Sequence, residues 1–238
     1  ESGAWVSPMA MDPRDPKILY IGHHNLWKST NRGSQWQKIN VPSESNELRS
    51  IALSESQAST IYCATINKLF ATHDGGANWT TLMTTSAAIS DIVVDPNNHQ
   101  RCWVTLSGYS NGYKVIELNG TSQKNISGSL PNVPVNTITY QKNSPDRLYL
   151  GTDLGVFYTD KNLNDWIQLS NGLPNVVVAD IKIHYKSGKL RAATYARGLW
   201  ETTLNNCNLP QPKVTVVGET AFCQGESCVL VAPDGFES

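Results

Sequence analysis

A repeat of about 43 residues runs through most of this 238-residue chain and limits what the chain can fold into. The segments Leu26–Trp36 and Leu69–Trp79 align at a shift of 43 residues. Trp27 matches Phe70, and the same register continues at Phe157 and Trp200, 87 and 43 residues further along. Because 87 residues are two periods, one copy is expected near residue 115, at Lys114–Glu117. Such a period is typical of an array of equivalent structural units.

Two further registers divide each unit into short strands. Aromatic residues recur at intervals of 42, 41 and 46 residues, at Tyr20, Tyr62, Trp103 and Tyr149. Isoleucines recur at 41, 46 and 43 residues, at Ile51, Ile92, Ile138 and Ile181. Four short strands in such a period are typical of a propeller blade. The sequence therefore predicts an all-β chain, a β-propeller of about 4.5 to 5 four-stranded blades within a larger propeller, whose fifth unit, from Val176 to Leu204, has only three strands.

Composition agrees with a β-rich fold and excludes two classes of function. The chain has seven Trp, nine Tyr, 17 Gly and 12 Pro, and only 16% of its residues are charged. The 19 Lys and Arg residues against 20 Asp and Glu give a net charge of −1, which leaves no basic excess for phosphates or anionic lipid. No apolar run approaches the roughly 18 residues that a membrane-spanning helix needs. We therefore expect no nucleic-acid partner and no membrane insertion.

A motif of the form Ser/Thr-x-Asp-x-Gly-x-x-Trp recurs within the repeat. It is complete in Thr72–Trp79, has Asn31 in the Asp place in Ser29–Trp36, and keeps only its ends in Thr159–Trp166. It resembles the Asp-box, or bacterial neuraminidase repeat, of sialidases, sortilin-type receptors and xyloglucan-hydrolase propellers. The resemblance covers residues 4–204 and implies a structural turn between third and fourth strands, on the face opposite the ligand face. The motif residues are Ser29, Asn31, Gly33, Trp36, Thr72, Asp74, Gly76, Trp79, Thr159 and Trp166.

Candidate ligand-binding residues occupy the turns between the second and third strands, on the other face of the propeller. They are His23, His24, Tyr109, Tyr113, Asp153, Tyr195 and Arg197. Aromatic faces beside polar groups suit a sugar or a peptide. The alternative is that these residues only form hairpin turns. His23 and His24 are adjacent and have no third ligand in view, so we expect no metal and no cofactor.

Asp91 and Asp180 are the only catalytic candidates. Each precedes the isoleucine that marks an inner strand, and two carboxyl groups roughly 5 to 10 Å apart are what a glycoside hydrolase needs. The alternative is that each Asp caps its strand. The Arg-Ile-Pro element and arginine triad of sialidases are absent, so the resemblance does not imply sialidase activity.

The end of the chain departs from the repeat. We expect blades over residues 1–204, a linker over 205–212 and, over 213–238, the truncated start of an Ig-like sandwich. The run from Phe222 to Ser227 resembles the opening of Ig-like modules that follow propellers in large secreted bacterial proteins. Among the five cysteines, Cys63 and Cys102 are expected to be buried thiols.

Together these features favour a non-catalytic ligand-binding or scaffold propeller of an exported bacterial protein, secreted or on the cell surface. The expected partners are a glycan or a protein, and other domains of the same chain. One alternative is a glycoside hydrolase of the xyloglucanase kind, with catalytic residues partly outside this sequence. A second is a sortilin-like propeller for protein interactions.

Overall fold

The computed structural model describes residues 3–44, 46–109, 112–169 and 172–204, and the backbone of 215–217 and 229–231. Two compact units divide the chain at Leu204. In the second unit, β20 (Thr215–Val217) pairs with β21 (Val229–Val231). The remainder of the predicted linker and Ig-like segment, with its three cysteines, lies outside the described residues. In the described part, no helix is long and apolar enough to span a membrane.

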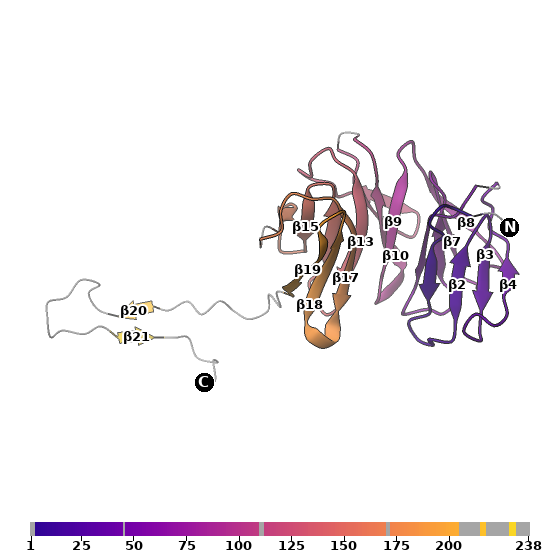
Figure 1. The fold of residues 1–238 in the computed structure, drawn as a ribbon, viewed down its shortest axis with the longest axis horizontal. Helices are drawn as coiled ribbons and strands as arrows, with labels where there is room; N and C mark the ends of the chain where they lie inside the picture. Colours follow the sequence, from indigo (N-terminus) through magenta and orange to yellow (C-terminus); the bar gives the residue numbers. More distant parts are fainter. Residues whose placement is uncertain are drawn as a thin grey trace, which may run out of the picture. The chain divides into compact units, whose positions relative to one another are not determined.

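Five consecutive antiparallel sheets make up the first unit, which confirms the predicted all-β propeller (Figure 1). Blades 1 and 2 contain β1 (Met9–Met11), β2 (Leu19–Gly22), β3 (Leu26–Ser29), β4 (Gln37–Ile39), β5 (Ser50–Leu53), β6 (Ile61–Ala64), β7 (Lys68–Thr72) and β8 (Thr80–Thr84). Blades 3 and 4 contain β9 (Ile89–Asp95), β10 (Asn98–Leu106), β11 (Val115–Asn119), β12 (Ser122–Asn125), β13 (Val135–Gln141), β14 (Arg147–Thr152), β15 (Gly155–Thr159) and β16 (Ile167–Gln168). Blade 5 contains β17 (Val178–His184), β18 (Lys189–Thr194) and β19 (Gly198–Thr203).

The repeat register is confirmed strand by strand. The copy expected near residue 115 is β11, and the four isoleucines lie in the first strands β5, β9, β13 and β17. The fifth unit has three strands, as its length indicated. The repeat period therefore predicts the strand order of every blade.

Strand order also defines two faces of the propeller. Each blade is a meander of antiparallel neighbours, so successive turns alternate between opposite faces. We call the face that carries the turns between second and third strands the upper face. The lower face carries the turns between first and second and between third and fourth strands. The 3-10 turn Tyr185–Ser187, which joins β17 to β18, marks the lower face at the bottom of Figure 1.

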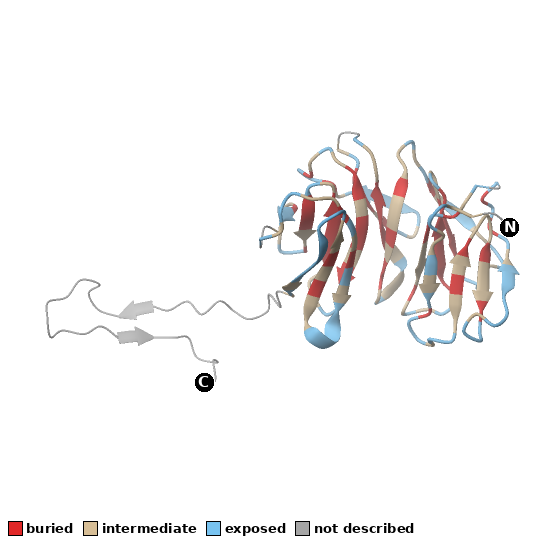
Figure 2. Ribbon diagram, in the orientation of Figure 1, coloured by how far each residue is buried: buried red, intermediate tan, exposed pale blue. Residues whose placement is uncertain are grey.

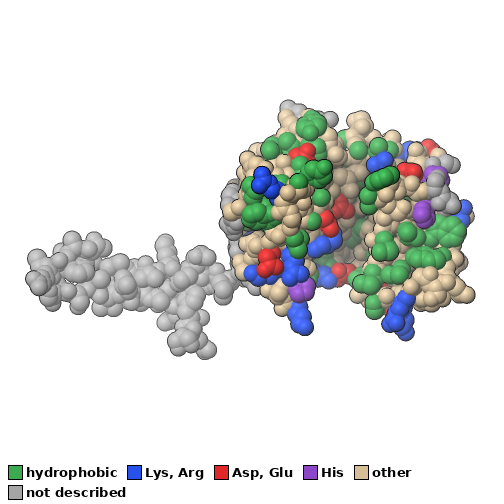
Figure 3. Space-filling model, in the orientation of Figure 1, with side chains coloured by type: hydrophobic (Ala, Val, Ile, Leu, Met, Phe, Trp, Pro, Cys, Tyr) green, Lys and Arg blue, Asp and Glu red, His purple; other side chains and the backbone are tan. Residues whose placement is uncertain are grey.

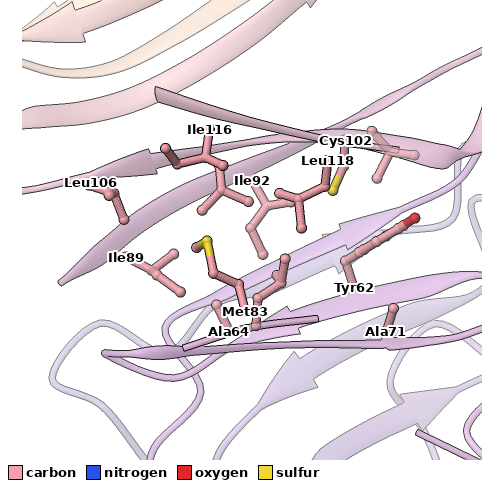
Figure 4. Packing of buried hydrophobic residues seen from close by; sticks show 13 residues of the cluster. Tyr62, Ala64, Ala71, Met83, Ile89, Ile92, Cys102, Leu106, Ile116 and Leu118 are labelled. Atoms are coloured by element: carbon pink, nitrogen blue, oxygen red, sulfur yellow. The ribbon is translucent and has the colours of Figure 1, made fainter. Parts of the chain in front are cut away.

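The core lies between neighbouring sheets, because each blade buries its apolar side chains against the next. Buried residues concentrate along the strands and exposed residues in the turns (Figure 2). Between blades 2 and 3, Tyr62, Ala64 and Met83 pack with Ile92 and Leu118 (Figure 4). Alternate residues of a strand point to opposite faces of its sheet, so each blade contributes one set of side chains to each neighbour.

Cys63 and Cys102 are free and fully buried, as predicted. Both occupy second strands and lie in separate clusters, Cys63 between blades 1 and 2 and Cys102 between blades 2 and 3. Burial raises the pKa of both thiols, which keeps them protonated at neutral pH. They act as small apolar core residues.

The outward face of blade 1 is apolar. Met9, Ile21 and Trp27 form one cross-strand row there. The equivalent row of blade 2, Ile51 with Cys63 and Phe70, packs into the cluster between blades 1 and 2. Met9 is 69% exposed, whereas its counterpart in blade 2, Ile51, packs against the cluster between blades 1 and 2.

The outward face of blade 5 is charged. Lys182, Arg191 and Glu201 form its cross-strand row, in register with Thr139, Tyr149 and Tyr158 of blade 4. Arg191 forms an ion pair with Glu201 at 3.3 Å. Figure 3 shows the contrast, with hydrophobic side chains prominent over blade 1 and charged side chains over blade 5. Blade 1 thus has an apolar outward row and blade 5 a charged one.

Two methionines test whether burial between blades carries the stability of the fold. Met83 is 6% exposed within the cluster of blades 2 and 3, and Met9 is 69% exposed. We expect Met83→Ala to lower the free energy of unfolding by about 2 to 5 kcal/mol, because it removes buried methylenes and leaves a cavity. Met9→Ala, the matched control, should change it by less than about 0.5 kcal/mol. Chemical denaturation measures both values, and equal losses would contradict this account of the core.

Candidate functional site

The predicted ligand-binding residues all lie in turns of the upper face, but over different blades. The histidines belong to blade 1, Tyr109 and Tyr113 to blade 3, Asp153 to blade 4, and Tyr195 with Arg197 to blade 5. The three tyrosines are prominent, with exposed fractions of 73% for Tyr109, 51% for Tyr113 and 76% for Tyr195. The fold thereby collects solvent-facing aromatic rings on one face.

Asp153 and His23 differ from the exposed tyrosines in what surrounds their side chains. The Asp153 carboxylate accepts a hydrogen bond from Asn136 Nδ2 at 2.9 Å, which fixes it to the inner strand β13. His23 lines a hollow of about 360 Å³ with Ile21, Trp27 and Trp36, on the apolar outward face of blade 1. His23 Nδ1 is buried and has no partner among the described residues. The structure therefore separates His23 from the tyrosines.

Asp91 joins three blades at the centre of the propeller. Its two oxygens accept hydrogen bonds from Ser50 Oγ of blade 2 at 3.3 Å and from its own neighbour Ile92 N at 2.8 Å. They also accept hydrogen bonds from Thr137 Oγ1 at 3.0 Å and Ile138 N at 3.1 Å, both of blade 4. Four donors use about all the lone pairs of a carboxylate. Burial nevertheless raises the pKa of Asp91.

Asp180 lies beside Asp91 through a shared threonine. Thr137 Oγ1 is 3.0 Å from Asp91 Oδ2 and 3.3 Å from Asp180 Oδ1, so those two carboxylate oxygens are at most about 6.3 Å apart. Asp180 also accepts a hydrogen bond from Lys182 Nζ at 2.7 Å, and its side chain is 50% exposed. One carboxyl is thus a link between blades, and the other is an exposed partner of a lysine.

In blades 1 and 2, side-chain hydrogen bonds close the turns that carry the motif. In blade 2, Asp74 Oδ1 accepts hydrogen bonds from Asn78 N at 2.9 Å and Thr72 Oγ1 at 2.7 Å, and Gly76 has a φ of +99°. In blade 1, Asn31 Oδ1 accepts the matching bond from Gln35 N at 2.8 Å. The backbone donor of Asn78 is the main reason that the pKa of Asp74 lies far below its ordinary value. These turns lie on the lower face and hold the hairpins closed.

Sequence reasoning missed a cleft on the lower face, between blades 3 and 4. Its volume is about 590 Å³, and its walls include Arg101, Glu117 and Asp146. The available signal was the third copy of the motif, in which Lys161 and Leu163 replace the Asp and Gly.

Comparisons with solved structures place the fold among β-propellers. The chain is similar to a GH74 xyloglucanase from Xanthomonas campestris, with a TM-score of 0.67 and 11% identity over 85% of this chain and 37% of that one. It is also similar to the Cps50 (Swd1) β-propeller domain from Myceliophteria thermophila, with a TM-score of 0.68 and 12% identity over 97% of this chain and 72% of that one. An extracellular domain from B. thetaiotaomicron matches with a TM-score of 0.62 and 17% identity, over 90% of this chain and 28% of that one.

These similarities establish the fold alone. No family model and no curated protein matches the sequence. This chain spans about a third of the length of the GH74 enzymes that it resembles. The chain is a β-propeller whose structural relatives include both glycoside hydrolases and other propellers.

The raised pKa of Asp91 predicts a specific pH dependence. A carboxyl whose pKa is higher in the folded chain binds more protons when folded, so its contribution to stability falls as pH rises above about 3.8, its ordinary value. Asp91→Asn removes this titration. The free energy of unfolding of the variant relative to the wild type should therefore rise as pH increases from 3.8 towards neutrality.

Denaturant unfolding of both proteins across that pH range measures the difference. The test is how this difference in the free energy of unfolding changes with pH. Its absolute size is not used, because that also includes the altered hydrogen bonds of the asparagine amide. A constant difference would show that the hydrogen-bond donors balance the effect of burial on the pKa of Asp91, and a difference that falls with pH would show that they outweigh it.

Proposed function

We propose that this chain is a non-catalytic propeller module of an exported protein, which binds a carbohydrate or protein ligand on its upper face. The observation that carries the proposal is the display of Tyr109, Tyr113 and Tyr195, each more than half exposed, on that one face. Exposed aromatic rings are costly to hydrate and are favoured contacts for sugar rings and for protein partners. The resemblance of the repeat motif to Asp-box propellers supports the proposal, because it puts the ligand face opposite the motif turns.

The surroundings of Asp91 support a binding role over catalysis. A general acid or nucleophile needs a free oxygen directed at the substrate, and both Asp91 oxygens are already occupied by donors from three blades. Export is included in the proposal because an extracellular domain shares the fold.

Aromatic truncation on the upper face tests the proposed binding. We expect the chain to bind members of a glycan array, and Tyr109→Ala or Tyr195→Ala to weaken that binding about tenfold, as for the loss of one aromatic contact. Tyr185→Ala is the control, because Tyr185 is a 48% exposed tyrosine of the lower-face turn. Glycan binding that withstands both upper-face variants would refute the assignment to this face. The sortilin-like alternative predicts that the chain binds no glycan. It predicts instead that the wild type binds a protein partner and that Tyr195→Ala does not.

A second candidate function is glycoside hydrolysis, which the short separation of Asp91 and Asp180 favours. The upper limit of about 6.3 Å between their oxygens includes the 5 to 5.5 Å typical of retaining enzymes. The raised pKa of Asp91 suits a general acid, and the exposed Asp180 suits a nucleophile. A xyloglucanase is among the structures that share the fold.

Hydrolysis assays distinguish the two functions. The binding proposal predicts no release of reducing ends from xyloglucan by the chain. The hydrolase alternative predicts turnover that Asp180→Asn lowers by about 10²- to 10⁴-fold. Ser50→Ala is the control, since it removes a hydrogen bond to Asp91 without removing a carboxylate. Turnover that depends on Asp180 would overturn the non-catalytic proposal.

A further inference from the structure

The cleft between blades 3 and 4 arises where the third copy of the motif has degenerated. At the junction of blades 1 and 2, the intact motif turn lies directly against the outer strand β4. A Cβ on Gly76 would be only 2.3 Å from Ile39 Cγ2, so no space is left there. In blade 4, Leu163 takes the place of this glycine, and a cleft of about 590 Å³ lies between its turn and blade 3.

The turn of blade 4 nevertheless remains anchored at its far end. Trp166 Nε1 donates a hydrogen bond to Ile126 O at 2.7 Å, and Asp165 Oδ1 accepts one from Ser129 N at 3.0 Å. Nearer the centre, Trp103 stacks on Tyr140 with 5.4 Å between ring centroids. The cleft is therefore bounded by fixed contacts on both sides. Its size lies within the range of about 300 to 1,000 Å³ that is typical of ligand sites.

Paired charges line the cleft. Arg101 Nε donates to Glu117 Oε1 at 2.6 Å, and its Nη1 contacts Asp146 and, at 3.3 Å, Asp95. Its guanidinium lies 4.5 Å from the centre of the Trp103 ring, which holds it in place. Lys161 Nζ is 3.0 Å from Asp146 Oδ2. Around Arg101 and Lys161, each fixed charge therefore has an opposite charge beside it.

The ion pairs favour an uncharged ligand over a charged one in this cleft. Beside Arg101 and Lys161, a phosphate or a cation would have to displace an existing ion pair, because these charges already compensate one another. A hydroxyl group can accept from the lysine or arginine and donate to a carboxylate at the same time, without breaking the pair. Burial acts to raise the pKa of Asp146, but the hydrogen bonds from Arg101, Lys161 and Tyr140 outweigh it and hold this pKa below its ordinary value, so the group stays an acceptor at neutral pH. Apolar C–H surface can rest on Ile126 and Leu163, which are partly exposed and also line the cleft.

We propose that the cleft between blades 3 and 4 is a second binding site, on the opposite side from the upper face, for a neutral oligosaccharide. Glu117 and Asp146 accept hydrogen bonds from sugar hydroxyls, and Lys124 and Lys161 donate to them. The site is independent of the ligand proposed for the upper face, since it shares no residue with it.

Calorimetric titration of the whole chain tests this site with cellotetraose, xylotetraose and mannotetraose as neutral probes and tetragalacturonate as the anionic one. We expect at least one neutral tetrasaccharide to bind. Glu117→Gln keeps the shape of the side chain and should weaken that binding at least tenfold. Lys124 and Asn164 are exposed cleft residues whose replacement leaves the core intact. Lys124→Ala should weaken binding by a similar factor, and Asn164→Trp should block it by filling the cleft.

The upper-face variants Tyr109→Ala and Tyr195→Ala serve as controls and should leave tetrasaccharide binding in the cleft unchanged. If Tyr109→Ala and Tyr195→Ala both lose tetrasaccharide binding while the cleft variants bind as the wild type does, all glycan binding lies on the upper face and the cleft proposal is overturned. Lack of binding by every neutral probe would also overturn it. Tighter binding of tetragalacturonate than of the neutral probes would overturn the choice of a neutral ligand.

Discussion

Every blade of this propeller has two faces to cover, and that requirement organises the rest of the propeller. The strands are too short for any blade to bury both faces by itself, so each blade depends on its neighbours for its core. Phe70 and Cys63 are buried only because blade 1 covers them. Asp91 adds a polar connection to the apolar one, since its carboxylate links backbone and side chains of three blades near the centre. Apolar packing and hydrogen bonds therefore both connect each of these blades to its neighbours.

The repeat period was sufficient to predict the strands, because a blade is a local structure. Ile92 and Ile138 were expected in inner strands and lie in β9 and β13, and the motif-free third unit was found at β11. The hydrogen bonds of the motif turn are local as well, because Thr72, Asp74 and Asn78 are near neighbours in the sequence.

The arrangement between blades could not be obtained in this way. The contact of Asp91 and Asp180 with one threonine depends on how three blades are spaced around the centre, which no period in the sequence encodes. The same holds for the cleft beside Arg101, whose partners Glu117 and Asp146 come from two blades. For the upper face, the sequence located the turns correctly, and the exposed fractions of Tyr109 and Tyr195 came from the structure.

The outward rows of blades 1 and 5 differ in chemistry, which matters for any contact between them. Such a contact would place Met9, Ile21 and Trp27 against Lys182, Arg191 and Glu201. It would bury the Arg191–Glu201 ion pair against hydrocarbon, at the cost of its hydration. The two rows are therefore poor partners for one another, although neighbouring blades of the described propeller all pack by the same stacking rule.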